Sequence, residues 1–190
     1  MRKIIFAVLC SAAQVSVADW GLNNEASTLS FISTKNASIT EVHTFKELSG
    51  KVKNNGAAAL KINLDSVETH IPIRNDRMKQ FLFETDLFKE ALVELTIDPD
   101  KIQSLVPGSR INMPVKAKLS LHGSTQDIGT RLRVVKMQNN GLEVSTIEPI
   151  ILSIGLFDLQ SGLDKLKEIA KLGSIATSVP VALNLVFDPQ

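Results

Sequence analysis

The feature that most constrains this chain is a strand-type alternation of apolar and polar residues that is broken at residues 66–83. There Asn75 can cap a helix, and Met78, Phe81 and Leu82 recur at the three-and-four spacing of one helical face. A short amphipathic helix within a β-protein must bury its apolar face, against the sheet or across the mouth of a barrel. The segment therefore predicts a lid over a container for an apolar ligand.

The alternation has the period of two that half-buried strands require. Short helices are predicted at 98–105 and from Asp158, as its cap, to about residue 170, and Asn-Gly turns at 54–56 and 138–141. The chain is thus mainly β and forms one domain, as an antiparallel barrel or a sandwich. The predicted strands are 29–33, 39–45, 60–67, 92–97, 111–121, 127–137, 142–147 and 175–187.

Strand parity predicts which side chains face the interior, because successive residues of a strand point to opposite faces. Between residues 111 and 121, leucines at 119 and 121 share one face and lysines at 116 and 118 share the other. The final strand turns Val179 to Phe187 inward at every second position, with an irregularity expected at Pro180. The predicted interior set is Phe31, Phe45, Ile62, Leu64, Leu119, Leu121, Leu132 and Val144.

Residues 1–18 have the pattern of a cleaved secretory signal, with Arg2 and Lys3 before an apolar run and small residues before Asp19. The mature domain, residues 19–190, is therefore expected in the periplasm. The apolar run is shorter than the roughly 20 residues of a bilayer span, so no membrane span is predicted in the mature chain. Cys10, the single cysteine, lies in this run, which leaves the mature chain without a thiol.

Charge and motif spacing exclude several functions. The 21 basic and 20 acidic residues are spread along the chain, so no nucleic-acid partner is predicted. The spacing of His43, His70 and His122 matches no metal motif, and no metal or cofactor is predicted. Ser66, His70 and Asp76 lie close in sequence but without a nucleophile elbow, so the protein is not predicted to be an enzyme.

Several short motifs, taken in order, resemble the YceI-like family of periplasmic, lipocalin-like proteins. The resemblance implies an antiparallel eight-stranded barrel with two or three short helices, one near the barrel mouth. It also implies that the interior holds a polyisoprenoid lipid, such as an isoprenoid quinone or a prenyl phosphate, without catalysis. Two departures are Asn75, where the family often has an acidic residue, and Phe157-Asp158 in place of Phe-Gly. The motifs are Ser27-Thr-Leu-Ser-Phe31, Glu41-Val-His-Thr-Phe45, Leu48-Ser-Gly50, Leu64-Asp-Ser-Val-Glu-Thr69, Arg74-Asn-Asp-Arg-Met78 and Leu119-Ser-Leu-His-Gly123.

Two polar residues join the predicted ligand site. His43 shares strand parity with Phe45, so it is either polar lining of the cavity or a rim histidine bonded to backbone. Arg74 either meets a phosphate or quinone oxygen, or ties the lid to Asp65 or Glu68, and the tie is preferred. The full predicted ligand-binding set is Phe31, His43, Phe45, Ile62, Leu64, Arg74, Met78, Phe81, Leu82, Leu119, Leu121, Leu132 and Val144.

These observations predict a periplasmic carrier that holds an isoprenoid lipid in an apolar barrel. The alternative is a non-enzymatic interaction or scaffold protein whose core is filled by its own side chains. A homodimer is left open.

Overall fold

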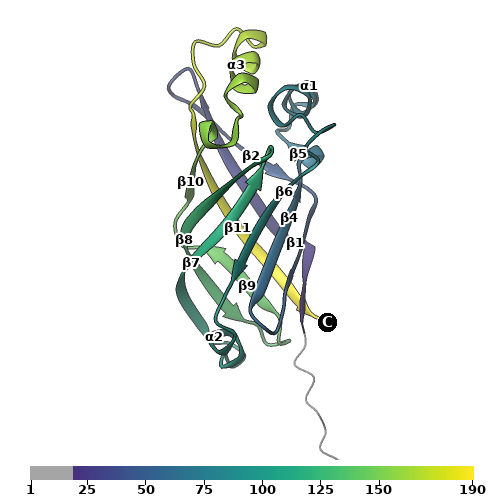
Figure 1. The fold of residues 1–190 in the computed structure, drawn as a ribbon, viewed down its shortest axis with the longest axis vertical. Helices are drawn as coiled ribbons and strands as arrows, with labels where there is room; N and C mark the ends of the chain where they lie inside the picture. The colour runs from purple at the N-terminus through teal and green to yellow at the C-terminus, as the bar shows by residue number, and fades with distance from the viewer. Residues whose placement is uncertain (1–18) are drawn as a thin grey trace, which may run out of the picture.

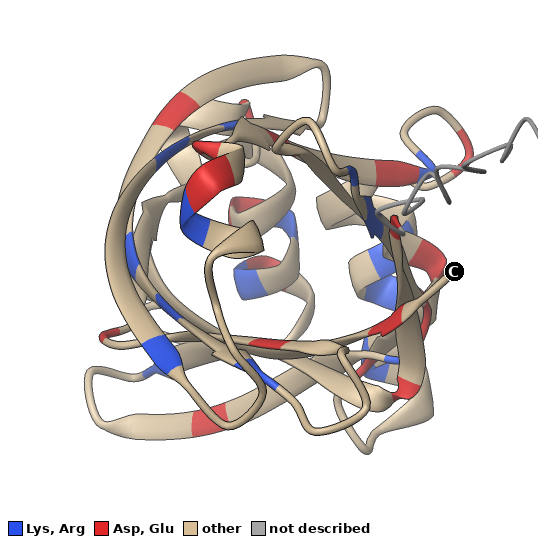
Figure 2. Ribbon diagram, turned by 90° about the horizontal axis from the view of Figure 1, so that it is seen from below, with Lys and Arg blue, Asp and Glu red and all other residues tan. Residues whose placement is uncertain are grey.

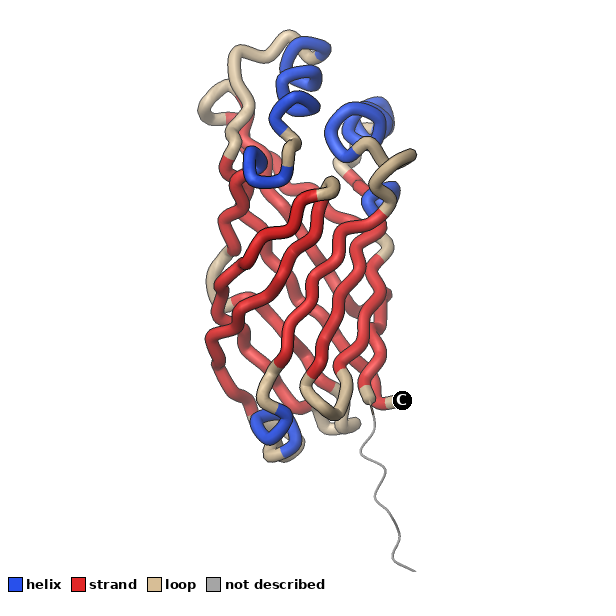
Figure 3. The backbone as a smooth tube through the Cα atoms, viewed as in Figure 1, coloured by secondary structure: helices blue, strands red, loops and turns tan. Residues whose placement is uncertain are grey.

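A computed structural model describes residues 19–190 of the chain, so the predicted signal sequence at 1–18 lies outside the described residues. The chain forms one antiparallel sheet of 11 strands (Figures 1 and 3). The strands are β1 (Trp20–Lys35), β2 (Ile39–Phe45), β3 (Leu48–Val52), β4 (Ala57–Asn63), β5 (Val67–Glu68), β6 (Glu90–Thr96), β7 (Arg110–Leu121), β8 (Ser124–Lys136), β9 (Leu142–Thr146), β10 (Ile150–Ser153) and β11 (Ser178–Pro189).

The sheet closes on itself because β11 pairs with β1 as well as with β9. The closed ring consists of eight strands, β1, β3, β4, β6, β7, β8, β9 and β11, and is seen along its axis in Figure 2. The other three strands extend the wall at one end: β2 pairs with the second half of β1, β5 with β2, and β10 with the first residues of β11. The expected eight-stranded antiparallel barrel is confirmed.

Helical segments lie at both ends of the barrel. One end carries α1 (Pro72–Arg77), the π-helical turn η2 (Met78–Phe83) and α3 (Gln160–Ile169), and the other carries α2 (Pro99–Gln103) (Figure 1). Two short 3-10 turns, η1 (Leu64–Ser66) and η3 (Ile154–Phe157), also lie at the α1 end. We call this the lid end. Within residues 19–190, no helix has the length and apolar character needed to cross a membrane.

The predicted turns and the predicted helix at 98–105 are present. Gly56 has φ +85°, and a Cβ there would lie 1.8 Å from the carbonyl oxygen of Ile97, so only glycine fits this turn. Asn140 adopts φ 64° in the second hairpin turn. The short helix predicted at 98–105 is present as α2, and the Asp98 side chain caps it by accepting a hydrogen bond from the amide of Asp100 at 3.2 Å.

The two predicted helix caps are wrong. Helix α1 begins at Pro72, since proline suits the first helical position, and Asn75 lies inside the helix and accepts from Thr69 instead. Asp158 has φ 55° at the end of η3, and its carboxylate accepts from the Ser124 hydroxyl at 2.8 Å. Both side chains satisfy donors that lie outside the helix they were expected to cap.

Strand lengths differ from the expectation where polar residues interrupt the alternation. β1 starts at Trp20 and has a register irregularity between Asn23 and Thr28. The irregularity interrupts the alternation of apolar and polar residues, so the first half of β1 was not predicted as strand. β3 is too short to show the period. Pro180 causes no irregularity, because it pairs in register with Ile151 of β10 and lies beyond Val181, where the pairing of β11 with β1 ends.

Candidate functional site: an apolar cavity inside the barrel

The barrel encloses a cavity of about 230 Å³. For comparison, an engineered cavity of about 150 Å³ in another protein binds benzene. Its walls come from strands around the whole ring, and side chains of η2, η3 and α2 close its two ends. Among the described residues that line it, Thr130 is the single polar one. The interior is therefore hollow and suited to hydrocarbon, whereas the scaffold alternative requires a filled core.

Strand parity correctly predicted most of the wall residues that line the cavity. The whole predicted interior set lines the cavity, as do the inward positions of the final strand. Alternation succeeds here because each wall strand has one face toward the cavity and one toward solvent. With Leu82 of the lid, the members of the predicted ligand-binding set that line the cavity are Phe31, Phe45, Ile62, Leu64, Leu82, Leu119, Leu121, Leu132 and Val144.

The lid meets the cavity through residues that differ from the predicted helical face. Leu82 and Phe83 line the cavity, while Met78 is buried beside them and Phe81 is half-buried, and neither lines it. The cause is the π-helical geometry of η2, whose hydrogen bonds link i and i+5, so a three-and-four spacing no longer defines one face. For this reason Phe83 was not predicted as a lining residue, and no local sequence pattern indicates the π-helical turn.

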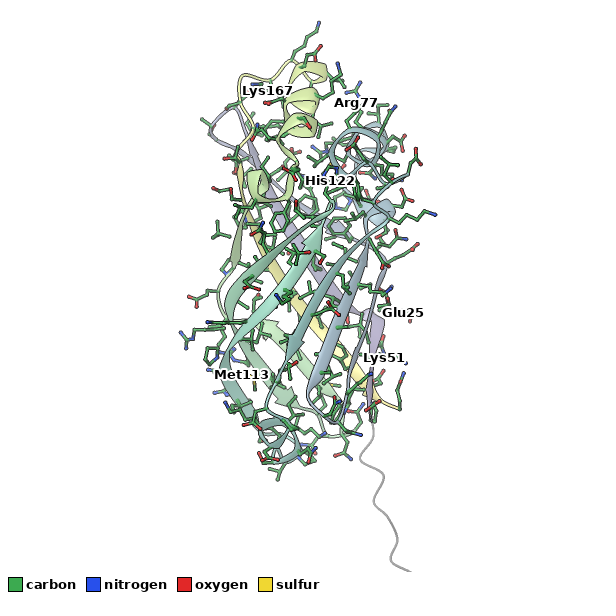
Figure 4. The ribbon with its side chains drawn as sticks, viewed as in Figure 1. Glu25, Lys51, Arg77, Met113, His122 and Lys167 are labelled. Atoms are coloured by element: carbon green, nitrogen blue, oxygen red, sulfur yellow. The ribbon has the colours of Figure 1, made fainter. Side chains whose placement is uncertain are left out.

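The lid has two parts that touch. A Cβ at Gly162 of α3 would lie 2.1 Å from the carbonyl oxygen of Phe81, so the backbones of α3 and η2 pack directly together. Side chains then fix the lid to the barrel. Thr85 donates to Asp65 at 2.6 Å, and His122 and Glu84 form a 2.8 Å contact at the position labelled in Figure 4.

His43 lies at the lid end of the cavity, behind the Phe31 ring at a centroid distance of 5.2 Å. It is 2% exposed, and its Nε2 forms a 2.8 Å hydrogen bond with the Ser33 hydroxyl. Burial, with a smaller contribution from the Arg74 charge, lowers the pKa of His43 to about 4, so the ring is neutral at pH 7. Its Nδ1 has no partner in the described part of the chain. The histidine bonds a side chain rather than backbone, and it does not line the cavity.

Arg74 ties the lid to the barrel, but not through the expected carboxylates. Its Nη1 donates to Glu41 at 2.8 Å and its Nη2 donates to the carbonyl of Thr69 at 2.6 Å. Asp65 instead accepts from Thr85, and Glu68 pairs with Lys46, so both predicted partners are wrong. Glu41 reaches Arg74 because β2 pairs with β5, and the chain runs from β5 into α1.

Glu41 is the anion of a small polar cluster above the cavity. Lys35 contacts it at 2.7 Å from the neighbouring strand, and hydrogen bonds from Lys35 and Arg74 lower the pKa of Glu41 to about 2. The Nε of Arg74 is buried without a partner among the described residues. Three buried nitrogens at the lid end, on His43, Arg74 and His122, thus have no hydrogen-bond partner among the described residues.

Other polar residues do not assemble into a reactive site. No group of three or more metal-binding side chains exists within residues 19–190. The Ser66 hydroxyl donates to the carbonyl of Asn63 and accepts from the amide of Glu47, so it stabilises the η1 turn.

A closed antiparallel barrel with an apolar interior and a helical lid defines a lipocalin-like protein. The chain matches the YceI-like domain over residues 20–187, and it belongs to this family. A comparison with curated proteins gives no match.

Solved structures share the fold. A polyisoprenoid binding domain from Saccharophagus degradans, implicated in plant cell wall breakdown, is 34% identical with a TM-score of 0.88, covering 90% of this chain and 98% of that domain. BcnA of Burkholderia cenocepacia is 17% identical with a TM-score of 0.68, covering 87% of this chain and 98% of its own. The Campylobacter jejuni YceI protein is 14% identical with a TM-score of 0.54, covering 100% of this chain and 99% of its own. The last two similarities concern the fold alone.

Proposed function

We propose that this protein is a carrier that binds an isoprenoid lipid, with the hydrocarbon tail in the barrel and without catalysis. The observation that carries the proposal is the cavity of about 230 Å³ whose described lining has one polar residue, Thr130. The similarity to the polyisoprenoid binding domain of Saccharophagus degradans supports the same ligand class. A periplasmic location is part of the proposal and depends on the signal pattern of residues 1–18.

Burial of the tail is sufficient to give useful affinity. Each buried methylene contributes about 0.8 kcal/mol, so one five-carbon isoprene unit contributes at most ~4 kcal/mol. Three such units contribute at most ~12 kcal/mol, which leaves about micromolar affinity at best after an entropic cost of association of at least ~4 kcal/mol. Length selection then depends on how much of the tail the cavity can enclose.

The head group belongs at the lid end, where polar nitrogens are available. The unsatisfied nitrogens of His43 and Arg74 are suited to bind an oxygen of a quinone or a prenyl phosphate. Lys35 and Arg74 carry two positive charges against the one negative charge of Glu41, so this cluster is compatible with the carbonyl of an isoprenoid quinone and with the anion of a prenyl phosphate.

The test is extraction of the purified mature protein followed by mass spectrometry, and titration of delipidated protein with an isoprenoid quinone and a prenyl phosphate. An Ala117→Phe variant fills the cavity from β7, while Ala26→Phe makes the same change at an exposed position of β1. We expect Ala117→Phe alone to lose binding while both variants unfold cooperatively. Lipid-free protein that takes up neither lipid would reject the carrier function.

A further inference from the structure

The end of the barrel that carries α2, which we call the α2 end, holds a buried lysine that the carrier function does not use. Lys136 is the last residue of β8 and is 8% exposed. It pairs with Leu142 of β9 and follows Val134 by two positions, and both of these residues line the cavity. Strand parity therefore directs the Lys136 side chain to the inside of the barrel, directly beyond the apolar lining.

The Lys136 amine has no counter-ion in this structure. Its Nζ lies 4.6 Å from the ring centroid of Trp20, and that ring is fixed by a 2.9 Å hydrogen bond from its Nε1 to the carbonyl of Asn140. Within residues 19–190, no carboxylate forms an ion pair with Nζ and no acceptor binds it. The aromatic face attracts the cation but leaves the N–H donors of the ammonium free. Lysine is almost never buried without a partner, so this arrangement calls for an anion.

The acidic side chains at the α2 end do not supply that anion. Asp19 accepts a hydrogen bond from the backbone amide of Asn54 at 3.0 Å. The acidic residues at the start of α2 are exposed, and those on β9 and β11 alternate with cavity-lining residues and so face outward. They are Asp98, Asp100, Glu143 and Asp188.

A hydroxyl without a partner lies beside Lys136. The carbonyl of Ser109 accepts a hydrogen bond from the backbone amide of Lys136 at 2.9 Å, so the two residues are neighbours across β7 and β8. Ser109 directly precedes β7 and continues the inward alternation of Val115 and Ala117, which line the cavity. Its hydroxyl is buried and has no hydrogen-bond partner among the described residues. An ammonium and a hydroxyl that both lack an acceptor are suited to bind one oxyanion.

We propose that Lys136 and Ser109 bind an oxyanion, a carboxylate or a phosphate, at the α2 end of the barrel. The ammonium supplies the charge, the hydroxyl supplies a second donor, and the Trp20 ring forms an apolar wall beside them. The oxyanion is either the head group of an acidic lipid whose chain enters the cavity or a free anion. The site is separate from the lid-end nitrogens, and it does not depend on the carrier function, because a free anion needs no tail.

The acid–base behaviour of Lys136 agrees with this site. Burial lowers the pKa of Lys136 because it disfavours the charged amine. An oxyanion bound at Nζ stabilises the ammonium and should raise this pKa again.

The test is titration of the mature protein with inorganic phosphate, with a prenyl phosphate and with the matching prenyl alcohol. Trp20 is the single tryptophan, so its fluorescence reports on an anion bound beside its ring. The variants are Lys136→Met, which removes the charge and keeps the chain length, Ser109→Ala, and the control Lys116→Met at an exposed position of β7. Cooperative urea unfolding of each variant checks the fold.

We expect Lys136→Met to bind the prenyl phosphate about tenfold more weakly than wild type, since a hydrogen bond to a charged group is lost. Ser109→Ala should also bind it more weakly, Lys116→Met should bind it as wild type does, and the affinity for the prenyl alcohol should be the same in all four proteins. A Trp20 response to inorganic phosphate that Lys136→Met lacks would identify a free anion as the ligand. A response to the prenyl phosphate alone would identify an acidic lipid.

The site would be overturned if wild type and Lys136→Met bound the prenyl phosphate equally and Trp20 did not respond to inorganic phosphate. An equal loss of affinity for the prenyl alcohol in Lys136→Met would overturn it as well. If Lys136→Met does not unfold cooperatively, Ser109→Ala decides by the same criteria. Protein that binds the alcohol without any effect of Lys136 on phosphate binding overturns the oxyanion site alone, and protein that binds inorganic phosphate but neither prenyl compound overturns the carrier function alone.

Discussion

Replacing His43 together with its partner Ser33 should remove a pH-dependent loss of stability from this protein. His43 is 2% exposed and its pKa is lowered to about 4, against an ordinary value of 6.5. Between these two values the unfolded chain binds a proton at His43 that the folded chain does not bind. The free energy of unfolding must therefore fall as the pH falls from 6.5 to 4.

The magnitude follows from the size of the shift. The difference between 6.5 and about 4 corresponds to about 3 kcal/mol when the whole interval is crossed, at about 1.36 kcal/mol for each pKa unit. At pH 4.5 most of this loss, about 2.5 kcal/mol, is already present. Because the loss comes from one buried ring, the variant His43→Leu, Ser33→Ala should lack it. The second substitution is needed so that the Ser33 hydroxyl does not lose its partner.

The assay is urea unfolding at several pH values between 7.5 and 4.5, followed by fluorescence of Trp20, which is the single tryptophan and is buried. We expect the stability difference between wild type and variant to change by about 2.5 kcal/mol in favour of the variant across this range. A Ser33→Ala single variant is the control and should keep the wild-type slope. Parallel pH profiles for wild type and the double variant would refute the reasoning.

Three further predictions concern the lid and the cavity. Gly162→Ala should destabilise the protein by about 1–3 kcal/mol in urea unfolding, because the new Cβ forces α3 away from Phe81, whereas Gly155→Ala, which meets open space, should change it little. The Glu41→Gln variant should lose less stability than wild type as the pH falls from 4.5 to 2. The pKa of Glu41 is lowered, so its charged carboxylate stabilises the folded state above this pH range and protonation removes that stabilisation within it. An acid-unfolding profile equal to wild type would contradict this. Leu142→Ala, at a side chain 1% exposed on the cavity wall, should cost about 2–5 kcal/mol, and a thermal unfolding midpoint equal to wild type would contradict it.

Local sequence patterns predicted which side chains of the barrel wall face the cavity and which face outward. The side chains of Leu119 and Leu121 line the cavity while Lys116 and Lys118 face outward, as period two requires. The turn at Gly56 could also be predicted from the sequence, because the tolerance of a positive φ depends on one residue and its neighbours. Each of these features depends on residues that are adjacent or nearly adjacent in the chain.

The features that could not be predicted from the sequence depend on contacts between strands and helices that are distant in the chain. The partner of Arg74 is Glu41, 33 residues away, and only the strand order brings the two together. Phe83 replaces Phe81 at the cavity because η2 is π-helical, and η2 packs directly against Gly162 of α3, which is about 80 residues away in the chain.

The sequence by itself determined that most strands have one apolar and one polar face, and the motif order indicated the family. The tertiary structure decided that these faces close into a ring through β1 and β11, and that the ring keeps a hollow centre. It also decided that Phe31, Val181 and Ile150, far apart in the chain, lie side by side in the cavity wall. The physical reason is that periodicity is a property of a single strand, whereas closure, hollow volume and rows across strands are set by register between segments distant in sequence.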